Sequence, residues 1–213
     1  MTAVTRVYLV RHGETEWNQN TPGYCGWSDI PLNSKGIAQA EALGRRFEPE
    51  LLSAVICSDL ERAYFTAQQI ADRTGCVVHK DARFREINYG DWEGKSPEQL
   101  ETEDPDRFNE WRDNPDTVAP RGGETLQQVL DRAAPAAAEW IERHAGQSIA
   151  IVAHKTTVRL LLCWAMGLPA LNYGRILQQN AAINLIEVRN GRPLVGLIND
   201  TCHLPEELVT PAV

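Results

Sequence analysis

VYLVRHG, residues 7–13, is the stretch of sequence that decides the fold. Its first four residues are apolar and include two valines, a pattern typical of a short strand buried on both faces. Arg11, His12 and Gly13 follow at once, so we expect the carboxyl end of this strand to open into a polar loop. Because ligands of open parallel sheets bind beyond the carboxyl ends of the strands, Arg11 and His12 are the first candidates for a functional site.

Three further apolar runs have the length of strands and alternate with segments of helical periodicity. The predicted strands are 52–57, 76–79 and 148–153; the predicted helices are 34–47, one opened by Ser58 with Glu61 in a capping box, and 124–144. Strands that alternate with helices indicate right-handed crossovers and a mostly parallel sheet. The predicted fold class is therefore α/β, a three-layer sandwich with helices on both faces of the central sheet.

The C-terminal part of the chain predicts an antiparallel edge for this sheet. Two apolar segments, 182–188 and 194–198, are separated by Asn190-Gly191. An Asn-Gly pair favours the positive φ angles of a tight hairpin turn. We therefore expect the last two strands to form a hairpin.

Length and composition favour one domain. The chain has 213 residues, of which 43% are hydrophobic, so we expect a single core over 1–213. One segment, 83–123, differs in texture, since it carries Trp92, Trp111, four prolines and many charges with little periodicity. We call this segment the excursion. Its composition fits equally well a surface addition with a small core around the tryptophans and a lid over the site.

Charge and cysteine usage exclude several classes of protein. The net charge is −8 and the Lys and Arg residues are scattered, which argues against a nucleic-acid partner. The N-terminal apolar run is too short for a signal peptide or a membrane span, so we expect a soluble cytoplasmic protein without a membrane partner. Five cysteines without a C-x-x-C pair suit neither a disulfide framework nor a zinc site and are interpreted as reduced thiols.

Polar groups suited to phosphate follow three of the four predicted parallel strands. The first strand ends in Arg11 and His12, the second leads into the helix that carries Arg62, and the last ends at 154–156, His-Lys-Thr. Guanidinium groups bind phosphate oxygens in a bidentate fork, and helix N-termini direct free N–H groups at anions. Two arginines and two histidines can position and neutralise a phosphoryl group with no metal and no cofactor. The expected ligand is a small phosphorylated metabolite.

The two histidines have different expected roles. Cationic neighbours disfavour the protonated form of His12, which keeps its lone pair for attack on phosphorus. His154 is expected to donate a hydrogen bond to the phosphoryl group and to stabilise charge in the transition state.

The segment LVRHGET, 9–15, resembles the signature of the histidine-phosphatase superfamily, which includes the phosphoglycerate mutases. Similar segments follow in the same order, namely CSDLERA (57–63), REINYGDWEG (85–94), GGET (122–125) and VAH (152–154). Five ordered segments across about 150 residues are far more specific than R-H-G alone. The resemblance implies a phosphoglycerate-mutase-like fold and a place in the phosphatase branch, near the metal-independent phosphoserine and α-ribazole phosphatases.

The same resemblance implies a set of site residues. It makes His12 the residue that is phosphorylated and Asn18 a further contact of the phosphate. Glu86 takes the place of the general acid that protonates the leaving alkoxide and later activates water, a role that favours a raised carboxyl pKa under a partial lid. The implied catalytic residues are His12, Glu86, His154, Arg11 and Arg62.

One departure from the family pattern lies beside His154. Many relatives have Ser-His-Gly-Gly where this chain has Ala-His-Lys-Thr at 153–156. We therefore include Lys155 and Thr156 among the predicted substrate-binding residues. Lys155 is interpreted either as an exposed residue at a helix start or as a partner for a substrate carboxylate.

The sequence leaves several alternatives open. A cofactor-dependent phosphoglycerate mutase is the second hypothesis, although the run Asp91-Trp92-Glu93-Gly94 and the compact chain favour hydrolysis. A non-catalytic sensor of phosphorylated ligands is a hypothesis of another class, and a metal-dependent hydrolase is less favoured. The substrate, the choice between monomer and homodimer, and the role of His203 in the C-terminal segment are undecided.

Overall fold

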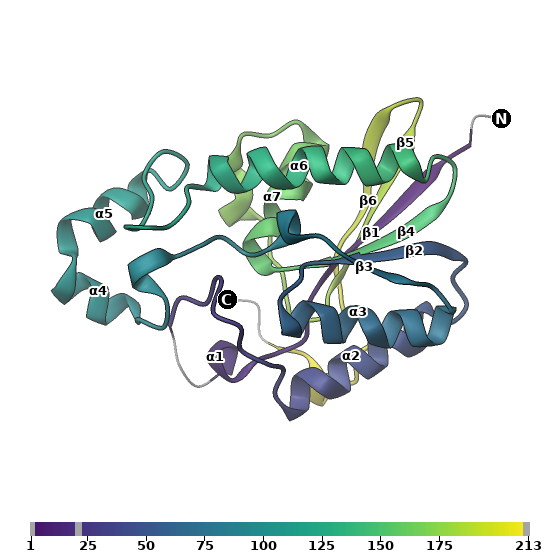
Figure 1. The fold of residues 1–213 in the computed structure, drawn as a ribbon, viewed down its shortest axis with the longest axis horizontal. Helices are drawn as coiled ribbons and strands as arrows, with labels where there is room; N and C mark the ends of the chain where they lie inside the picture. Colours follow the sequence, from purple (N-terminus) through teal and green to yellow (C-terminus); the bar gives the residue numbers. More distant parts are fainter. Residues whose placement is uncertain (1–2, 20–22, 211–213) are drawn as a thin grey trace.

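The computed structural model describes residues 3–19 and 23–210 (Figure 1). Its strands are β1 (Thr5–Arg11), β2 (Leu52–Cys57), β3 (Val78–Lys80), β4 (Ser148–Ala153), β5 (Ile183–Arg189) and β6 (Arg192–Asp200). Its α-helices are α1 (Glu16–Gln19), α2 (Ser34–Phe47), α3 (Glu61–Thr74), α4 (Pro97–Glu103), α5 (Pro105–Asp113), α6 (Leu126–Arg143) and α7 (Lys155–Met166). Its 3-10 helices are η1 (Ala82–Phe84), η2 (Gly90–Trp92), η3 (Ala170–Arg175) and η4 (Glu206–Leu208).

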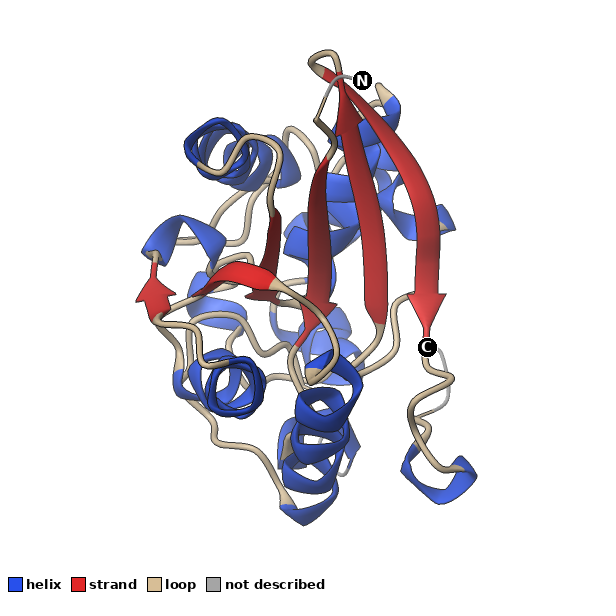
Figure 2. Ribbon diagram, turned by 90° about the vertical axis from the view of Figure 1, so that its right-hand side faces the viewer, coloured by secondary structure: helices blue, strands red, loops and turns tan. Residues whose placement is uncertain are grey.

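The strands form one mixed sheet in the order β3-β2-β4-β1-β5-β6. Strands β3, β2, β4 and β1 are parallel, whereas β5 and β6 pair antiparallel. Figure 2 shows the longer strands side by side in this sheet. Asn190 and Gly191 form the turn between β5 and β6, both with positive φ. The predicted mostly parallel sheet with an antiparallel edge is therefore confirmed.

Helices cover both faces of the sheet, as predicted. The side chains of β1 alternate, so that Val7 and Leu9 pack in the core beneath α6 and α7 while Tyr8 and Val10 pack in the core beneath α2 and α3. Figure 1 shows α6 and α7 on one side of the strands and α2 and α3 on the other. Strand β1 is thus buried between two layers, and its carboxyl end is the place where polar side chains can leave the core.

The predicted start of α3 is wrong. The helix begins at Glu61, and its N-cap residue, Leu60, makes no side-chain capping bond. Ser58 Oγ instead accepts the backbone N–H of Leu60 at 3.3 Å, and the carboxylate of Asp29 accepts the N–H of Glu61 at 2.8 Å. A carboxylate from a distant loop supplies the negative charge that a helix N-terminus favours, so the local Ser-x-x-Glu spacing is not used.

Several other element boundaries differ from the prediction by one or two residues, and two of these differences are late starts. Strand β3 runs from Val78 to Lys80, two residues later than the start expected at Cys76. Helix α6 begins at Leu126, because Thr125 caps it in a capping box with Gln128. Both shifts leave the order of the elements unchanged.

The excursion adds no strand of the central sheet within the described residues. It contains η1, η2, α4 and α5, and it projects to one side of the sheet in Figure 1. Its apolar residues form a separate small core of Trp92, Leu100, Phe108 and Trp111, against which Tyr24 also packs. The small core around the tryptophans that one interpretation expected is therefore present.

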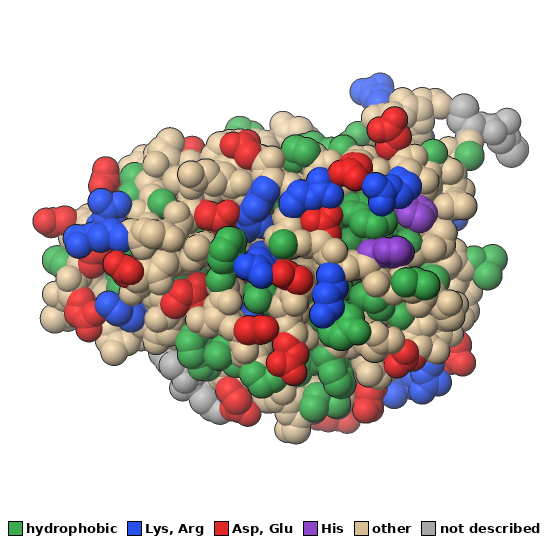
Figure 3. All heavy atoms as spheres, viewed as in Figure 1, with side chains coloured by type: hydrophobic (Ala, Val, Ile, Leu, Met, Phe, Trp, Pro, Cys, Tyr) green, Lys and Arg blue, Asp and Glu red, His purple; other side chains and the backbone are tan. Residues whose placement is uncertain are grey.

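The outer surface has no single basic face on the side that Figure 3 shows, where basic and acidic side chains are interspersed. No helix in the described part of the chain is long and apolar enough to cross a membrane.

Candidate active site

A cavity of about 440 Å³ lies at the carboxyl ends of β1 and β4. Seven of the eight predicted site residues line it, and the eighth, His154, is fully buried next to His12, with 5.0 Å between the ring centroids. The described residues around the cavity are Arg11, His12, Trp17, Asn18, Gly23, Tyr24, Cys25, Arg62, Glu86, Tyr89, Pro97, Lys155, Thr156, Asn180 and Thr210. Residues that are far apart in the sequence therefore meet around one space.

The hydrogen bond of His12 fixes which of its ring nitrogens carries the proton. Its Nδ1 lies 2.6 Å from the carbonyl oxygen of Gly13. Because a carbonyl can only accept, Nδ1 carries the proton, and in the neutral ring Nε2 keeps its lone pair. Burial, with the charges of Arg62 and Arg11, holds the pKa of His12 well below its usual value. His12 is therefore a neutral imidazole with an available nucleophilic nitrogen at neutral pH.

His154 has the opposite tautomer. The Nε of Arg62 donates to Nδ1 of His154 at 3.2 Å. Since a guanidinium can only donate, Nδ1 accepts and the proton of the neutral ring is on Nε2. Burial and the charge of Arg62 hold the pKa of His154 well below its usual value. Nε2 is buried without a hydrogen-bond partner among the described residues, so His154 presents a donor that an anion can satisfy.

Arg62 is held in place by three acceptors, none of them a carboxylate. Besides His154, its guanidinium donates to the backbone oxygen of Ser28 at 2.7 Å and to that of Gly26 at 2.6 Å. Arg11 donates to the backbone oxygen of Gln178 at 2.7 Å, and burial lowers the pKa of Arg11 to about 10. Neither guanidinium forms an ion pair with a carboxylate among the described residues, so both can donate to an anion in the cavity.

Glu86 is placed by the start of α7. Its two carboxylate oxygens accept the backbone N–H groups of Thr156 at 3.0 Å and Thr157 at 3.3 Å, and Oε1 also accepts the N–H of Ile87 at 3.0 Å. Helix α7 begins directly after β4, so this carboxyl is fixed at the rim of the sheet beside His154.

The remaining predicted residues have different surroundings. Asn18 is exposed, and its Oδ1 accepts from Asn180 and from the backbone of Thr15. Lys155 is half-buried and lines the cavity, so the interpretation as a freely exposed residue is wrong. His203 does not line the cavity. Burial lowers the pKa of His203 to about 4, and its ring nitrogens have no hydrogen-bond partner among the described residues.

The sequence did not indicate the outer wall of the cavity. Trp17, Tyr24, Tyr89 and Pro97 form this wall together with Cys25. Burial raises the pKa of Cys25 to about 11, so its thiol is protonated and a weak nucleophile at neutral pH. Tyr24 comes from the loop after β1, and Tyr89 and Pro97 come from the excursion. The aromatic and proline residues around them were the sequence signal that could have indicated this wall.

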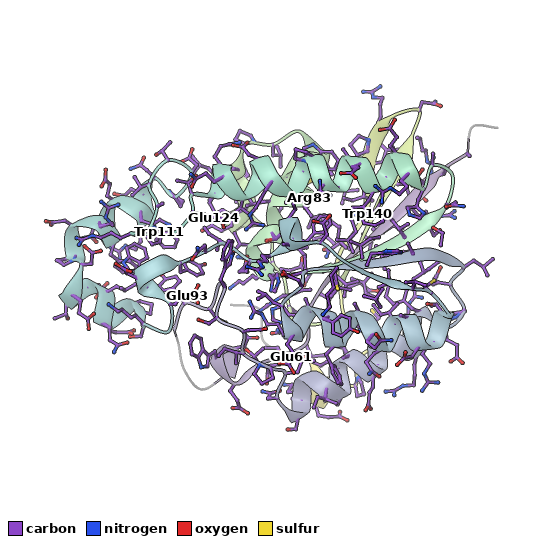
Figure 4. All side chains as sticks on the ribbon, viewed as in Figure 1. Glu61, Arg83, Glu93, Trp111, Glu124 and Trp140 are labelled. Carbon is purple, nitrogen blue, oxygen red and sulfur yellow. The ribbon has the colours of Figure 1, made fainter. Side chains whose placement is uncertain are left out.

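Two charged side chains that support the site were also missed. The carboxylate of Glu93 accepts the backbone N–H groups of Gly26, Trp27, Ser28 and Tyr89. Figure 4 shows Glu93 in the excursion, at the end nearest the loop after β1. Glu93 thus ties the excursion to the same loop whose backbone oxygens hold Arg62.

Arg132 holds the backbone around Glu86 in place, as Glu93 holds the loop after β1. This helix α6 residue donates to the backbone oxygens of Arg83, Arg85 and Glu86 at 2.8–2.9 Å. It also forms an ion pair with Glu124 at 2.8 Å, and Figure 4 shows Glu124 at the start of α6. The backbone before and at Glu86 is therefore anchored to the helical layer.

Comparison with known proteins identifies the family. A family model described as the histidine phosphatase superfamily (branch 1) matches residues 7–201. The chain belongs to this superfamily. The resemblance noted in the sequence is thus confirmed.

Relatives in this superfamily cover nearly the whole chain. Phosphoserine phosphatase 1 of Hydrogenobacter thermophilus is 32% identical over 95% of this chain and 96% of its own length. A probable phosphoglycerate mutase, GpmB, of Salmonella typhi is 33% identical over 98% of this chain and 97% of its own. The solved structure of YhfR from Bacillus stearothermophilus is 34% identical, with a TM-score of 0.87, and covers 93% of this chain and 98% of that protein.

Proposed function

We propose that this histidine-phosphatase chain is a phosphomonoesterase that hydrolyses a small phosphorylated metabolite through a phosphohistidine on His12. The observation that carries the proposal is the pair of complementary tautomers. His12 has its proton on Nδ1 and its lone pair on Nε2, whereas His154 has its proton on Nε2. One ring can attack phosphorus while the other donates to a phosphoryl oxygen.

In the first step, Nε2 of His12 forms a bond to phosphorus as the ester P–O bond breaks. The electron pair of that bond leaves with the alkoxide, which takes a proton from the carboxyl of Glu86. Arg11, Arg62 and Nε2–H of His154 neutralise the oxygens of the transferring group, with Asn18 as a further contact. The alcohol product then leaves the cavity.

In the second step, water takes the place of the alcohol. Glu86, now a carboxylate, accepts a proton from the water as its oxygen attacks phosphorus. The P–N bond breaks, its electron pair returns to Nε2 of His12, and inorganic phosphate is released. Each step needs only side chains of this chain, so the proposed mechanism is independent of a metal.

The excursion is proposed to cover the substrate as a lid within a single domain. Tyr89 and Pro97 line the cavity, and the small core around Trp92 gives them a rigid support. A volume of about 440 Å³ suits a metabolite of a few carbon atoms rather than a macromolecule. Phosphoserine is our preferred substrate, supported by the relative named phosphoserine phosphatase 1. A cytoplasmic location and the choice between monomer and homodimer stay predictions.

A cofactor-dependent phosphoglycerate mutase is the second candidate, favoured by the relative named a probable phosphoglycerate mutase. A mutase passes the phosphoryl group to a second substrate hydroxyl, whereas a phosphatase passes it to water. A non-catalytic sensor of phosphorylated ligands is less favoured, because His12, Glu86 and His154 are all in place.

The experiment that tests the proposal is a screen of phosphomonoesters in the presence of a chelator. We expect steady release of inorganic phosphate from phosphoserine or a similar ester, and loss of essentially all turnover in His12→Ala. The screen includes 3-phosphoglycerate, from which a mutase yields 2-phosphoglycerate. Release that stops in chelator, or equal activity of both proteins, refutes the mechanism.

A further inference from the structure

Lys155 lies in the wall of the cavity and has no ion-pair partner in the described part of the chain. It is the first residue of α7, and the described residues offer it neither an ion pair nor a hydrogen bond from its ammonium group. The three other lysines of the chain each have an acidic or aromatic partner, or a backbone oxygen. Lys155 is therefore distinguished from them by its surroundings.

The fold places Lys155 in an electrostatically unfavourable position. A helix N-terminus carries partial positive charge and disfavours a cation. Burial and the charges of Arg11 and Arg159 add to this cost, and together they lower the pKa of Lys155 to about 8. Glu86 is the carboxylate that opposes these effects, but its oxygens are occupied by backbone N–H groups. A ligand anion is what would make this placement favourable.

Arg159 adds a second unmatched charge one helical turn further along α7. It is 8% exposed, and its Nε has no hydrogen-bond partner among the described residues. The described residues also provide no ion pair for its guanidinium, although the charge of Glu86 acts on it. Burying an unpaired guanidinium is costly, so the start of α7 has an excess of positive charge that the fold itself does not balance.

The charges around the site exceed what one phosphate ester can balance. Arg11, Arg62, Lys155 and Arg159 are four cations, and Glu86 is the carboxylate placed among them; Glu14, which also acts on Arg11, forms an ion pair with Lys35. A phosphate monoester dianion offsets two of the three remaining positive charges. The remaining excess is one positive charge. This excess increases to two when Glu86 is protonated for its role as the acid. A single further negative charge on the substrate restores the balance while Glu86 is ionised and halves the excess when Glu86 is protonated.

We propose that Lys155 binds a carboxylate of the substrate, so that the phosphatase selects phosphorylated carboxylic acids over phosphorylated alcohols of the same size. This proposal rests on the proposed function, because it assumes that the phosphate group of the substrate binds the arginines while the carboxylate of the same molecule binds Lys155. The charge of Arg159, one turn further along α7, strengthens the positive potential at Lys155. A lysine suits this role, since its three ammonium donors can reach a carboxylate in several orientations.

The test compares two substrates that differ in one group. D-3-Phosphoglycerate and sn-glycerol 3-phosphate have the same carbon skeleton, but the first has a carboxylate where the second has a hydroxymethyl group. The quantity measured is the ratio of kcat/KM for the two compounds, followed by phosphate release at neutral pH. We expect the native protein to favour the carboxylate by about tenfold or more, the range of a charged hydrogen bond.

Three variants test whether Lys155 causes this preference. Lys155→Met keeps the aliphatic stem and is expected to reduce the ratio to near one, whereas Lys155→Arg keeps the charge and should retain most of it. Arg159→Met should reduce the ratio by a smaller factor, on the order of two- to threefold, because its charge acts at a distance. Lys80→Met is the matched control, since Lys80 is exposed on β3, stacks over Tyr64 and does not line the cavity.

The outcomes separate this proposal from the one it rests on. If no phosphomonoester is hydrolysed, the proposed function fails. If Lys155→Met lowers kcat/KM for both compounds by the same factor, Lys155 serves the phosphate and the carboxylate proposal is overturned. A native ratio near one overturns it as well, even though phosphatase activity is present. A fall in the ratio confined to the Lys155 and Arg159 variants supports it.

Discussion

The inner and outer ends of the cavity are built in different ways. The inner end consists of Arg11, His12, Arg62, His154 and Glu86, which are all buried. Arg11, His12 and His154 lie on or just after strands of the central sheet, whereas Arg62 lies in the first turn of α3 and Glu86 in the excursion. The outer end is the wall of Trp17, Tyr24, Cys25, Tyr89 and Pro97, which come from the short helix α1, from the loop that follows it and from the excursion.

This difference separates two tasks. The inner end holds groups that any phosphate ester presents, and its hydrogen bonds fix ring tautomers and guanidinium orientations in advance. The outer end contacts whatever the phosphate is attached to, and loops that vary in length can change it without disturbing the sheet. We therefore expect substitutions at the inner end to abolish chemistry and substitutions at the outer end to change selectivity.

Glu86→Gln is the substitution expected to affect the chemistry most among those that keep the fold of the inner end. The amide cannot protonate a leaving alkoxide, so kcat/KM for phosphoserine should fall by about a thousandfold. p-Nitrophenyl phosphate has a leaving group that needs little protonation, so its kcat/KM should fall much less. Steady-state kinetics with both esters measures the difference, and equal losses would show that Glu86 does not act as the acid.

Arg62→Met removes the guanidinium that joins the inner end to the loop after β1. We expect kcat/KM to fall by roughly a hundred- to a thousandfold, because one charged donor to the transferring phosphoryl group is lost. The tautomer of His154 is also released, since Nδ1 loses its donor. Inhibition by inorganic vanadate should weaken in parallel. Unchanged vanadate binding would contradict a phosphate contact from Arg62.

Glu93→Gln tests how far the excursion controls the inner end. Its carboxylate accepts several backbone N–H groups, and an amide nitrogen cannot accept them. We expect a loss of about 1–3 kcal/mol in the free energy of unfolding and about a tenfold fall in kcat/KM. Urea denaturation and kinetics measure both. Glu103→Gln, at an exposed ion pair with Lys95, is the control and should change neither.

Acid pH should destabilise the protein through the inner end. The pKa values of His12 and His154 are lowered in the folded state, so below about pH 6.5 the unfolded chain binds more protons. The free energy of unfolding should therefore fall as the pH decreases from about 6.5, by about 1.4 kcal/mol per pH unit for each histidine.

Denaturation at several pH values checks this slope. The folded-state pKa of His203 is also lowered, to about 4, so His154→Gln removes one of three contributing histidines and should reduce the slope by about a third. His79→Gln, at an exposed position against Trp140, is the matched control and should leave it unchanged. A native slope close to zero would show that the two imidazoles are not desolvated.

Most of the fold could be predicted from the sequence because its signals were local. The apolar runs of β1, β2 and β4 and the Asn190-Gly191 turn correspond to elements at or near the expected positions. The start of α3 could not be predicted, because its capping carboxylate, Asp29, is distant in the sequence. A helix end that is satisfied through tertiary contact has no signature in its own residues.

The inner end was accessible to sequence reasoning for a different reason. Chemically distinctive residues follow the strands, and parallel strands bring their carboxyl ends together, so Arg11, His12 and His154 were expected to meet. Glu93 and Arg132 were not predicted, because each binds the backbone of a segment that is distant in the sequence. Glu93 accepts hydrogen bonds from backbone N–H groups, and Arg132 donates hydrogen bonds to backbone oxygens. Isolated charges of that kind resemble ordinary surface residues until the chain is folded.

The most direct test of the account is to trap the phosphorylated enzyme. The native protein is mixed with its substrate, quenched in base within the first turnover and digested for mass spectrometry, with Glu86→Gln as a variant in which hydrolysis of the intermediate is slowed. The account predicts one phosphoryl group on the imidazole of His12. Phosphate on another residue, or turnover without any phosphorylated intermediate, would contradict it.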